Sequence, residues 1–307
     1  VSRANSGLFL STLVSEMIGC DCCCLSSFVY LVGVLTIASK VIPLLKKLKG
    51  NKPVELLEKN YKKDVVYFYQ FPGTETASSM SPFCIKIEAF LRLYKIKFER
   101  CNTMSGRGQN GQIPFIELNG EQIADSQIIF RRLTQIYNLK TYPDEQTAAF
   151  GHAVDRLLDN HTFNLLILVK QNIAGKIVEK MARDNGLPSF LIPIASTLSI
   201  LYFMLFHTVQ RATTSIGKFK ESEYNELFRN DLVQLQTILG SKKFLMGEEP
   251  TAVDCTALGQ FGSAYYAVPS ARYYLHDLLE SSEFAPLKEY FERTKTRIFG
   301  EEFCDKK

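Results

Sequence analysis

The stretch GQIPFIELNGEQIADSQIIF, residues 111–130, decides the fold of the domain that contains it. Asn119-Gly120 between two short apolar runs predicts a tight β-hairpin. Asp125-Ser126 after the second run predicts the N-terminus of a helix, where free N–H groups suit a carboxylate. Ile113-Pro114 before the first strand is a candidate cis peptide. Together these features indicate a site for a peptide-like ligand; the alternative interpretation is a plain hairpin followed by an ordinary helix cap.

Composition narrows the class of protein. The 307 residues predict one or two domains, and the net charge of +4 comes without a basic cluster interleaved with aromatics. We therefore expect no nucleic-acid partner. Of eight cysteines, four crowd into residues 20–24 and the others are scattered, which is no disulfide framework. The cluster is open to three interpretations, namely S-palmitoylation, soft-metal binding and packing. Elsewhere the spacing of Cys and His predicts no metal site.

The N-terminal segment, residues 1–53, is expected to be a separate unit with a membrane anchor. Residues 22–39 lack charge over 18 positions, the lower limit for a transmembrane helix, and lysines follow them. This asymmetry predicts a single-pass anchor in membrane lipid, with the folded domains in the cytosol. A cleaved signal peptide and a soluble amphipathic segment are the alternatives. A second uncharged stretch, 185–206, is expected to be buried or membrane-touching, with a second span as the alternative.

Residues 54–143 have the pattern of an α/β domain. A buried strand is predicted at 65–69 and a second strand at 97–101. Between them, Ser81 as N-cap and Pro82 at the first helical position predict a helix over 82–94. The helix that starts at Asp125 is expected to face inward with Ile128, Ile129 and Leu133. With the hairpin, this order predicts a small thioredoxin-like domain.

Residues 144–307 lack strand patterns and show helical periodicity. Phe228, Leu232, Leu235 and Leu239 form one apolar stripe. Thr251-x-x-Asp254 is a capping box, which predicts a helix start. We therefore expect an all-helical second domain.

The motifs also resemble a known family. The element order, Ile113-Pro114 and Asp125-Ser126 resemble the N-terminal domain of glutathione S-transferases. More specifically, YQFPGTETASSMSPFCIKIEAFLR (69–92), ADSQII (124–129) and FLMGEEPTAVDCTALGQF (244–261) resemble the failed axon connections proteins, a metaxin-like branch of that superfamily. The cadmium-responsive proteins of the branch are similar too. The resemblance covers about 64–300 and implies the glutathione S-transferase fold, with a thioredoxin-like N-terminal domain and an all-α C-terminal domain.

The resemblance implies glutathione as ligand or co-substrate. Ile113 and Pro114 would pair with its cysteinyl backbone. Asp125 would hold the ammonium of its γ-glutamyl end, while Ser126 and the helix N–H groups would hold the carboxylate.

Catalysis requires a group that holds the glutathione thiol as thiolate. Ser81 occupies the position where related omega-like enzymes carry cysteine, at a helix N-terminus whose dipole stabilises an anion. Tyr69, at the end of the first strand, is the second candidate. For Ser81 a purely structural cap is the alternative, and Cys84 is expected to be a packing residue. The long loop 70–80 departs from active transferases, so the pattern leaves catalysis open.

Two classes of function follow. The first is a membrane-anchored glutathione S-transferase-like protein with weak transferase or redox activity toward small electrophiles, acting in detoxification or stress response. The second is a non-catalytic adaptor of the same fold in axon development or in membrane protein trafficking and assembly. A homodimer is compatible with either class.

Overall fold

The computed structural model describes residues 55–103, 105–170, 173–184, 186–194, 196–197, 215–269 and 271–304. The chain divides into two compact units, Val1–Glu55 and Leu56–Lys307. The predicted anchor and the cysteine cluster at 20–24 lie outside the described residues. Within the described ranges, no helix combines the length and apolar character needed to cross a membrane. For the stretch 185–206 this finding covers only its described part.

The second unit begins with a four-stranded sheet. Its strand order is β2-β1-β3-β4, with β1 parallel to β2 and antiparallel to β3. The strands and the two helices that complete this domain are β1 (Val66–Gln70), α3 (Pro82–Leu93), β2 (Phe98–Asn102), β3 (Phe115–Leu118), β4 (Glu121–Ala124) and α4 (Ser126–Ile136). The predicted thioredoxin-like order is confirmed.

The hairpin formed by β3 and β4 follows its prediction closely. Asn119 and Gly120 have φ angles of 51° and 86°, the positive values that a two-residue hairpin turn of this type requires. The register pairs Phe115 with Ala124, and the Ile113-Pro114 bond is cis. Asp125 caps α4 directly after β4.

The two faces of the sheet have different coverings. Val66 and Phe68 of β1 pack in the main core with residues of α3 and α4, whereas Tyr67 and Tyr69 lie in a smaller cluster on the opposite face. In α4, Ile129 and Leu133 are buried as expected. The expectation that Ile128 also faces inward is wrong: its side chain is 48% exposed, because each helical residue is turned about 100° from its neighbour.

The described residues between 145 and 304 form helices joined by loops, as predicted. Its elements are α5 (Glu145–Arg156), the π-helix η1 (Leu157–Thr162), α6 (Phe163–Lys170), α7 (Ala174–Asp184), η3 (Ile216–Lys218), α9 (Glu221–Leu239), α10 (Ala252–Tyr265), α11 (Tyr274–Leu279), η4 (Ser282–Phe284) and α12 (Ala285–Phe299). The predicted stripe on α9 is buried.

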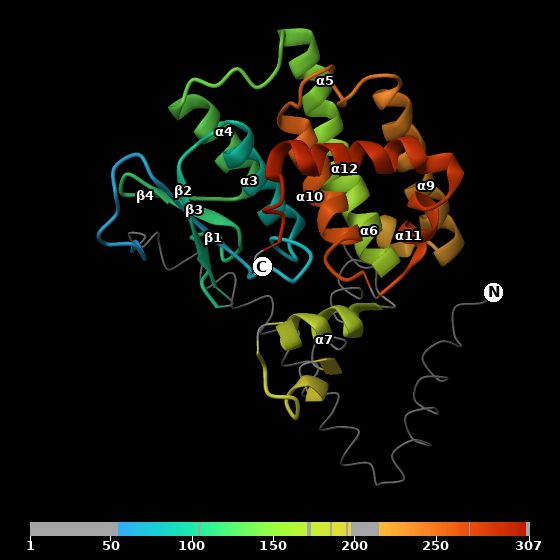
Figure 1. The fold of residues 1–307 in the computed structure, drawn as a ribbon, viewed down its shortest axis with the longest axis horizontal. Helices are drawn as coiled ribbons and strands as arrows, with labels where there is room; N and C mark the ends of the chain where they lie inside the picture. Colours follow the sequence, from blue (N-terminus) through green and yellow to red (C-terminus); the bar gives the residue numbers. More distant parts are fainter. Residues whose placement is uncertain are drawn as a thin grey trace, which may run out of the picture. The chain divides into compact units, whose positions relative to one another are not determined.

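Helix α10 forms the centre of the helical domain and contacts α3 (Figure 1). The predicted capping box is present, since Thr251 and Asp254 cap each other's backbone at its start. Gly259 permits the close approach of the two helices: a Cβ there would lie 2.5 Å from the carbonyl oxygen of Pro82. This contact brings the N-terminus of α3 beside the helical domain.

Candidate functional site

A polar cavity of about 320 Å³ lies between the two domains of the folded unit. Four of the six predicted site residues line it together: Ile113, Pro114, Asp125 and Ser126. They come from the loop before β3 and from the start of α4. The opposite wall comes from η1 and α6, through Asp159, Asn160, Phe163 and Asn164. The tertiary structure thus assembles the predicted ligand-binding residues into one site.

The start of α4 is partly occupied by its own cap. Asp125, at φ 79°, accepts hydrogen bonds at Oδ1 from the backbone N–H groups of Gln127 (2.9 Å) and Ile128 (3.3 Å). These are N–H groups that the sequence assigned to a ligand carboxylate. The backbone N–H and hydroxyl of Ser126 therefore become the main donors for an anion at this helix start.

The charged residues that line the polar cavity are acidic. Asp125 and Asp159 line it, and its described lining contains no lysine or arginine. Asp159 is neutralised from behind, because Lys86 Nζ lies 2.5 Å from its Oδ2 atom. The cavity therefore offers an ammonium group a closer match than it offers a carboxylate.

Lys86 is the centre of a buried network behind this cavity. Its side chain is fully buried on α3, and its ammonium contacts Asp155 (3.1 Å) as well as Asp159. Arg156 contacts both carboxylates, Thr256 donates to Asp155, and Gln260 donates to Asp159 over 3.1 Å. Two carboxylates within the protein therefore balance the charge of the Lys86 ammonium.

The two aspartates of this network titrate differently. Burial opposes ionisation of Asp155, but Lys86, Thr256 and Arg156 outweigh it and lower the pKa of this carboxyl. Burial, with repulsion from Asp155, raises the pKa of Asp159 above its usual value, even though Lys86 acts against it.

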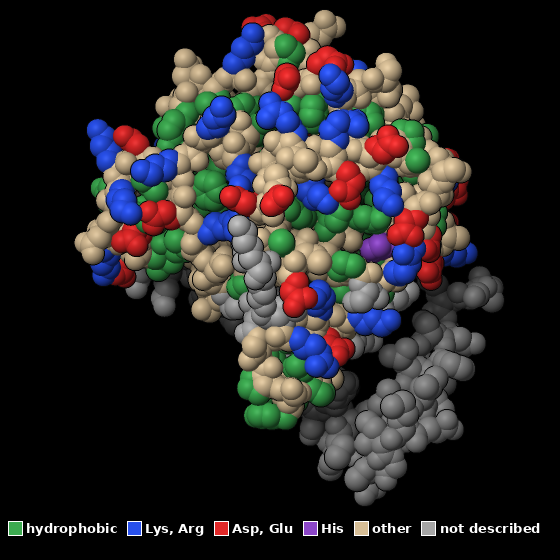
Figure 2. Space-filling model, in the orientation of Figure 1, with side chains coloured by type: hydrophobic (Ala, Val, Ile, Leu, Met, Phe, Trp, Pro, Cys, Tyr) green, Lys and Arg blue, Asp and Glu red, His purple; other side chains and the backbone are tan. Residues whose placement is uncertain are grey.

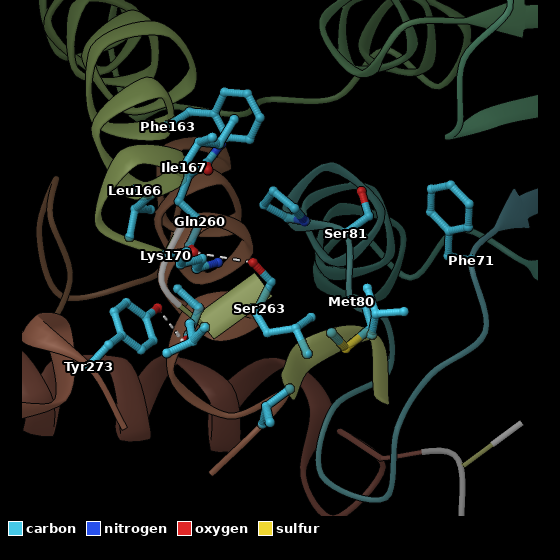
Figure 3. Close-up of a pocket in the computed structure, with 16 residues that line it drawn as sticks. Phe71, Met80, Ser81, Phe163, Leu166, Ile167, Lys170, Gln260, Ser263 and Tyr273 are labelled. Carbon is cyan, nitrogen blue, oxygen red and sulfur yellow. Dashed lines mark hydrogen bonds between the residues drawn. The ribbon is translucent and has the colours of Figure 1, made fainter. Parts of the chain in front are cut away.

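An apolar cavity of about 430 Å³ lies next to the polar one (Figure 3). Ser81 and Met80 line it from the start of α3, and Lys170 lines it from the end of α6. Phe163 lines both cavities, and its ring centroid lies 4.8 Å from that of Phe83. Ser81 therefore lines the apolar cavity and is absent from the lining of the cavity that holds the other four residues.

Ser81 acts as a helix cap, as predicted. Its Oγ accepts a hydrogen bond from the backbone N–H of Cys84 over 3.4 Å. The hydroxyl hydrogen remains able to donate to a ligand atom in the apolar cavity. Cys84 itself is fully buried, and burial raises the pKa of its thiol to about 11. This thiol is therefore protonated at neutral pH and behaves as a packing residue.

Tyr69 does not join either cavity. It lies on the opposite face of the sheet, where its ring stacks on Phe115 with the centroids 4.5 Å apart. Its hydroxyl donates to Glu117 Oε2 over 3.1 Å. Burial and the Glu117 carboxylate raise the pKa of the phenol. Tyr69 therefore packs on this face of the sheet. The same Glu117 carboxylate also accepts hydrogen bonds from the backbone N–H groups of Leu57 and Glu58.

Asp159, which lines the polar cavity, and its partners in the buried network behind that cavity were missed from the sequence. Asp155 and Asp159 are spaced four apart, the spacing of one helical face, and Lys86 interrupts the apolar run of its helix. Those signals indicate an internal ion pair, although no local pattern says which residues pair. His161 lies on the same π-helix as Asp159 and contacts Asp231 through Nδ1 at 2.9 Å.

Comparison with known proteins shows to which protein family the chain belongs. Two family models match the chain: the glutathione S-transferase N-terminal domain over residues 82–172 and the glutathione S-transferase C-terminal domain over residues 228–294, together about half of the sequence. The chain belongs to the glutathione S-transferase superfamily.

Within that superfamily the chain is similar to "Failed axon connections" of Drosophila melanogaster, as its motifs indicated. The identity is 30% over 261 residues, which is 80% of this chain and 62% of that protein. The chain thus spans less than two thirds of this relative's length.

Solved structures show the same fold. A glutathione transferase from Phanerochaete chrysosporium matches with a TM-score of 0.52 and 18% identity, over 76% of this chain and 98% of that one. A glutathione S-transferase of Ceriporiopsis subvermispora in complex with glutathione matches with a TM-score of 0.50 and 18% identity, over 75% and 98%.

Proposed function

We propose that this protein binds glutathione in the polar cavity. The observation that carries the proposal is that Ile113, Pro114, Asp125 and Ser126 line one cavity. Ile113 and Pro114 would contact the cysteinyl backbone, Asp125 the ammonium and Ser126 the γ-glutamyl carboxylate. A protein of the same fold has been solved with glutathione, which supports the choice of ligand.

The affinity should be modest. Glutathione carries two carboxylates and one ammonium, whereas the described lining of the cavity carries two aspartates and no cation. Asp125 also occupies two N–H groups at the start of α4. Both features weaken binding of the glutathione carboxylates, whereas the two aspartates favour its ammonium.

Turnover should be low. The sulfur of a bound glutathione would have to reach Ser81 past Phe163, which lines both cavities and packs beside Phe83. Tyr69 already donates its hydroxyl to Glu117 and offers no replacement. Any transferase or redox activity toward small electrophiles, in detoxification or stress response, would therefore be weak.

Two observations at the start of α3 favour a second candidate function, a non-catalytic adaptor. Ser81 serves as a cap for α3, and the buried Cys84 thiol stays protonated. The fold would then serve protein contacts in axon development or in membrane protein trafficking and assembly, in keeping with the name of the relative.

A binding experiment tests the first candidate. Glutathione is titrated calorimetrically into the whole chain, into Asp125→Ala and into Ser126→Ala. Each substitution should weaken binding about tenfold, since a hydrogen bond to a charged group contributes about 1.5 kcal/mol. Asp144→Ala is the matched control because Asp144 caps α5 in the same manner, through Thr147 N–H, and lines neither cavity. An affinity for glutathione that neither Asp125→Ala nor Ser126→Ala changes would reject the proposal.

An activity assay separates the two functions. Conjugation of glutathione to an aryl chloride is followed for the wild type and for Ser81→Ala. A measurable rate that Ser81→Ala abolishes would reject the adaptor. An absent rate, together with confirmed glutathione binding, would support it.

We further propose that residues 22–39 anchor the protein in a membrane with the folded unit in the cytosol. The uncharged stretch followed by lysines supports this orientation. Protease treatment of sealed vesicles carrying a C-terminally tagged chain tests it. The tag should be digested without detergent, and a protected tag would refute the orientation.

A further inference from the structure

The chain directly after α7 forms an exposed apolar surface. This apolar tip, residues 186–194, contains no charged residue. Phe190 is 76% exposed, more than any other large hydrophobic side chain that the structure describes, and Ile194, four positions on, is 56% exposed. Pro188 and Pro193 are exposed as well. Exposed apolar side chains that lie singly are ordinary on a protein surface, whereas a group of them marks a contact with another apolar body.

The apolar tip has a defined conformation. Gly186, at φ 75°, turns the chain away from α7, and two backbone hydrogen bonds of 3.0 Å and 2.8 Å close this turn onto the last turn of the helix. Within the tip, Ile192 is buried. Because the turn and Ile192 fix the segment, the exposure of Phe190 and Ile194 belongs to the folded state.

Charged side chains lie behind the tip, on α7. Figure 1 shows α7 on the side of the folded unit away from α5, and Figure 2 shows hydrophobic side chains at the outer end of this region with charged side chains nearer the body. Arg183 contacts Glu179 at 2.8 Å, and Lys180 contacts Glu75 at 3.5 Å. These pairs leave little net charge, so the absence of charge at its outer end is what distinguishes this region.

The chemistry of the tip favours one partner over others. A protein partner ordinarily covers an apolar patch within a polar rim that supplies hydrogen bonds, and residues 186–194 offer no charged side chain for such a rim. A phospholipid bilayer has an apolar layer beneath a polar surface, which matches an uncharged outer end with charged residues behind it.

The length of the chain outside the described residues gives a second reason to choose a bilayer. Residues 40–54 join the proposed anchor to the folded unit, and a chain of this length spans at most about 50 Å. A unit tethered so closely meets the same bilayer at a high effective concentration. A weak apolar contact would then be sufficient to hold it there.

We propose that the apolar tip is a second membrane contact, in which Phe190 and Ile194 enter the boundary between the head groups and the acyl chains of a phospholipid bilayer. The choice of a bilayer rests in part on the proposed anchor, whereas the exposure of the tip does not. The charged residues of α7 would stay in water. Together, the anchor and the tip would hold the folded unit in one orientation on the membrane instead of leaving it free to rotate about the linker.

A fluorescent probe at the tip tests this contact. The chain contains no tryptophan, so one substitution introduces a unique probe. The whole chain with Phe190→Trp is reconstituted into phosphatidylcholine vesicles whose acyl chains are either brominated or not, because bromine quenches only a probe that reaches the acyl region. Phe150→Trp is the matched control, since Phe150 is also an exposed phenylalanine and lies on α5. Circular dichroism establishes that each variant is folded.

The two probes should behave differently. Phe190→Trp should lose about half of its emission in brominated vesicles, since the apolar face of an interfacial segment lies about 5–10 Å into the boundary. Phe150→Trp should show no such loss. Adding Ile194→Asp to Phe190→Trp should remove most of the quenching, because a charged group resists transfer from water, whereas adding Gln146→Asp at an exposed residue of α5 should not. High salt and phosphatidylglycerol should leave the quenching unchanged, because the contact is apolar.

Several results would overturn the proposal. They are an unquenched probe at position 190, equal quenching of the two probes, quenching that Ile194→Asp leaves unchanged, and quenching that high salt abolishes. Emission at position 190 that is shifted to the blue yet not quenched would show that protein, such as a second copy of the chain, covers the tip. That result would also overturn the proposal.

An alkaline wash of the vesicles separates this contact from the proposed anchor. The wash retains a chain held by a transmembrane helix and releases one held only at the surface. A retained chain without quenching at position 190 would refute the tip contact and leave the anchor in place. A quenched chain that the wash releases would refute the anchor and leave the tip contact in place, and a chain that never associates with vesicles would refute both.

Discussion

Replacing Lys86 by methionine should strongly destabilise the folded unit. The substitution keeps an apolar stem of similar length and removes an ammonium that contacts Asp155 at 3.1 Å and Asp159 at 2.5 Å. Both carboxylates would then remain buried beside each other. Removing one partner of a buried ion pair costs about 3–5 kcal/mol.

The structure places the expected value near the lower end of that range. Arg156 still contacts both carboxylates, although its side chain is 40% exposed and solvent weakens its effect. Thr256 and Gln260 still donate hydrogen bonds. We therefore expect the free energy of unfolding to fall by about 3 kcal/mol.

Two further variants locate the cause of this loss. In the triple variant Lys86→Met, Asp155→Asn, Asp159→Asn, the uncompensated charges are gone, so most of the lost stability should return. Lys62→Met removes a lysine whose contact with Glu99 is exposed, and should cost less than about 1 kcal/mol. Urea unfolding followed by circular dichroism measures all three.

The pH dependence of the stability lost in Lys86→Met tests the electrostatic explanation independently. The folded-state pKa of Asp155 is lowered in the wild type, so its contribution to stability is present at neutral pH and is lost as the pH falls through about 4 and below. Without Lys86, burial should raise the pKa of both carboxyls, and such groups destabilise the fold only while ionised. The deficit of Lys86→Met should therefore shrink between pH 7 and pH 4. A deficit under about 1 kcal/mol at pH 7, or one independent of pH, would refute the electrostatic explanation.

Three other predictions concern the packing and burial of residues in the folded unit. Gly259→Ala should cost about 1–3 kcal/mol in urea unfolding, because the new Cβ would lie 2.5 Å from the carbonyl oxygen of Pro82; an unchanged midpoint would contradict the close approach of the helices. Asp254→Ala should cost at least about 3 kcal/mol, since this buried carboxylate accepts four hydrogen bonds whose donors would lose their partner; a loss below about 1 kcal/mol would contradict that role. In the native protein at pH 8, iodoacetamide should label the half-buried Cys101 before Cys84, whose pKa is raised to about 11 and whose side chain is fully buried; peptide mapping that finds Cys84 labelled first would be inconsistent with this burial.

The sequence was sufficient for features that depend on neighbouring residues. The turn at Asn119-Gly120, the cap at Ser81 and the capping box of Thr251 and Asp254 all match their predictions. Each depends on backbone angles and hydrogen bonds that span only a few positions. Local chemistry determines such elements, and the resemblance to transferases supplied their order in space.

The faces of the elements were harder to predict. Ile128 was expected inside and is exposed, although its neighbour Ile129 is buried. Tyr69 follows the alternation of β1 and lies on the face opposite α3. Periodicity states which residues share a face, but packing against the next layer decides which face is covered.

By itself, then, the sequence determined the two-domain fold and brought Ile113, Pro114, Asp125 and Ser126 into consideration as one site. Only the tertiary structure decided that Ser81 lines a different cavity, that Lys86 has counter-ions and that Lys170 has none among the described residues. The reason is physical. Lys86 and Asp155 lie 69 positions apart, and their contact exists only because α3 and α5 both pack against α10. A side chain's charge is local, but its solvation and its partners are properties of the packed molecule.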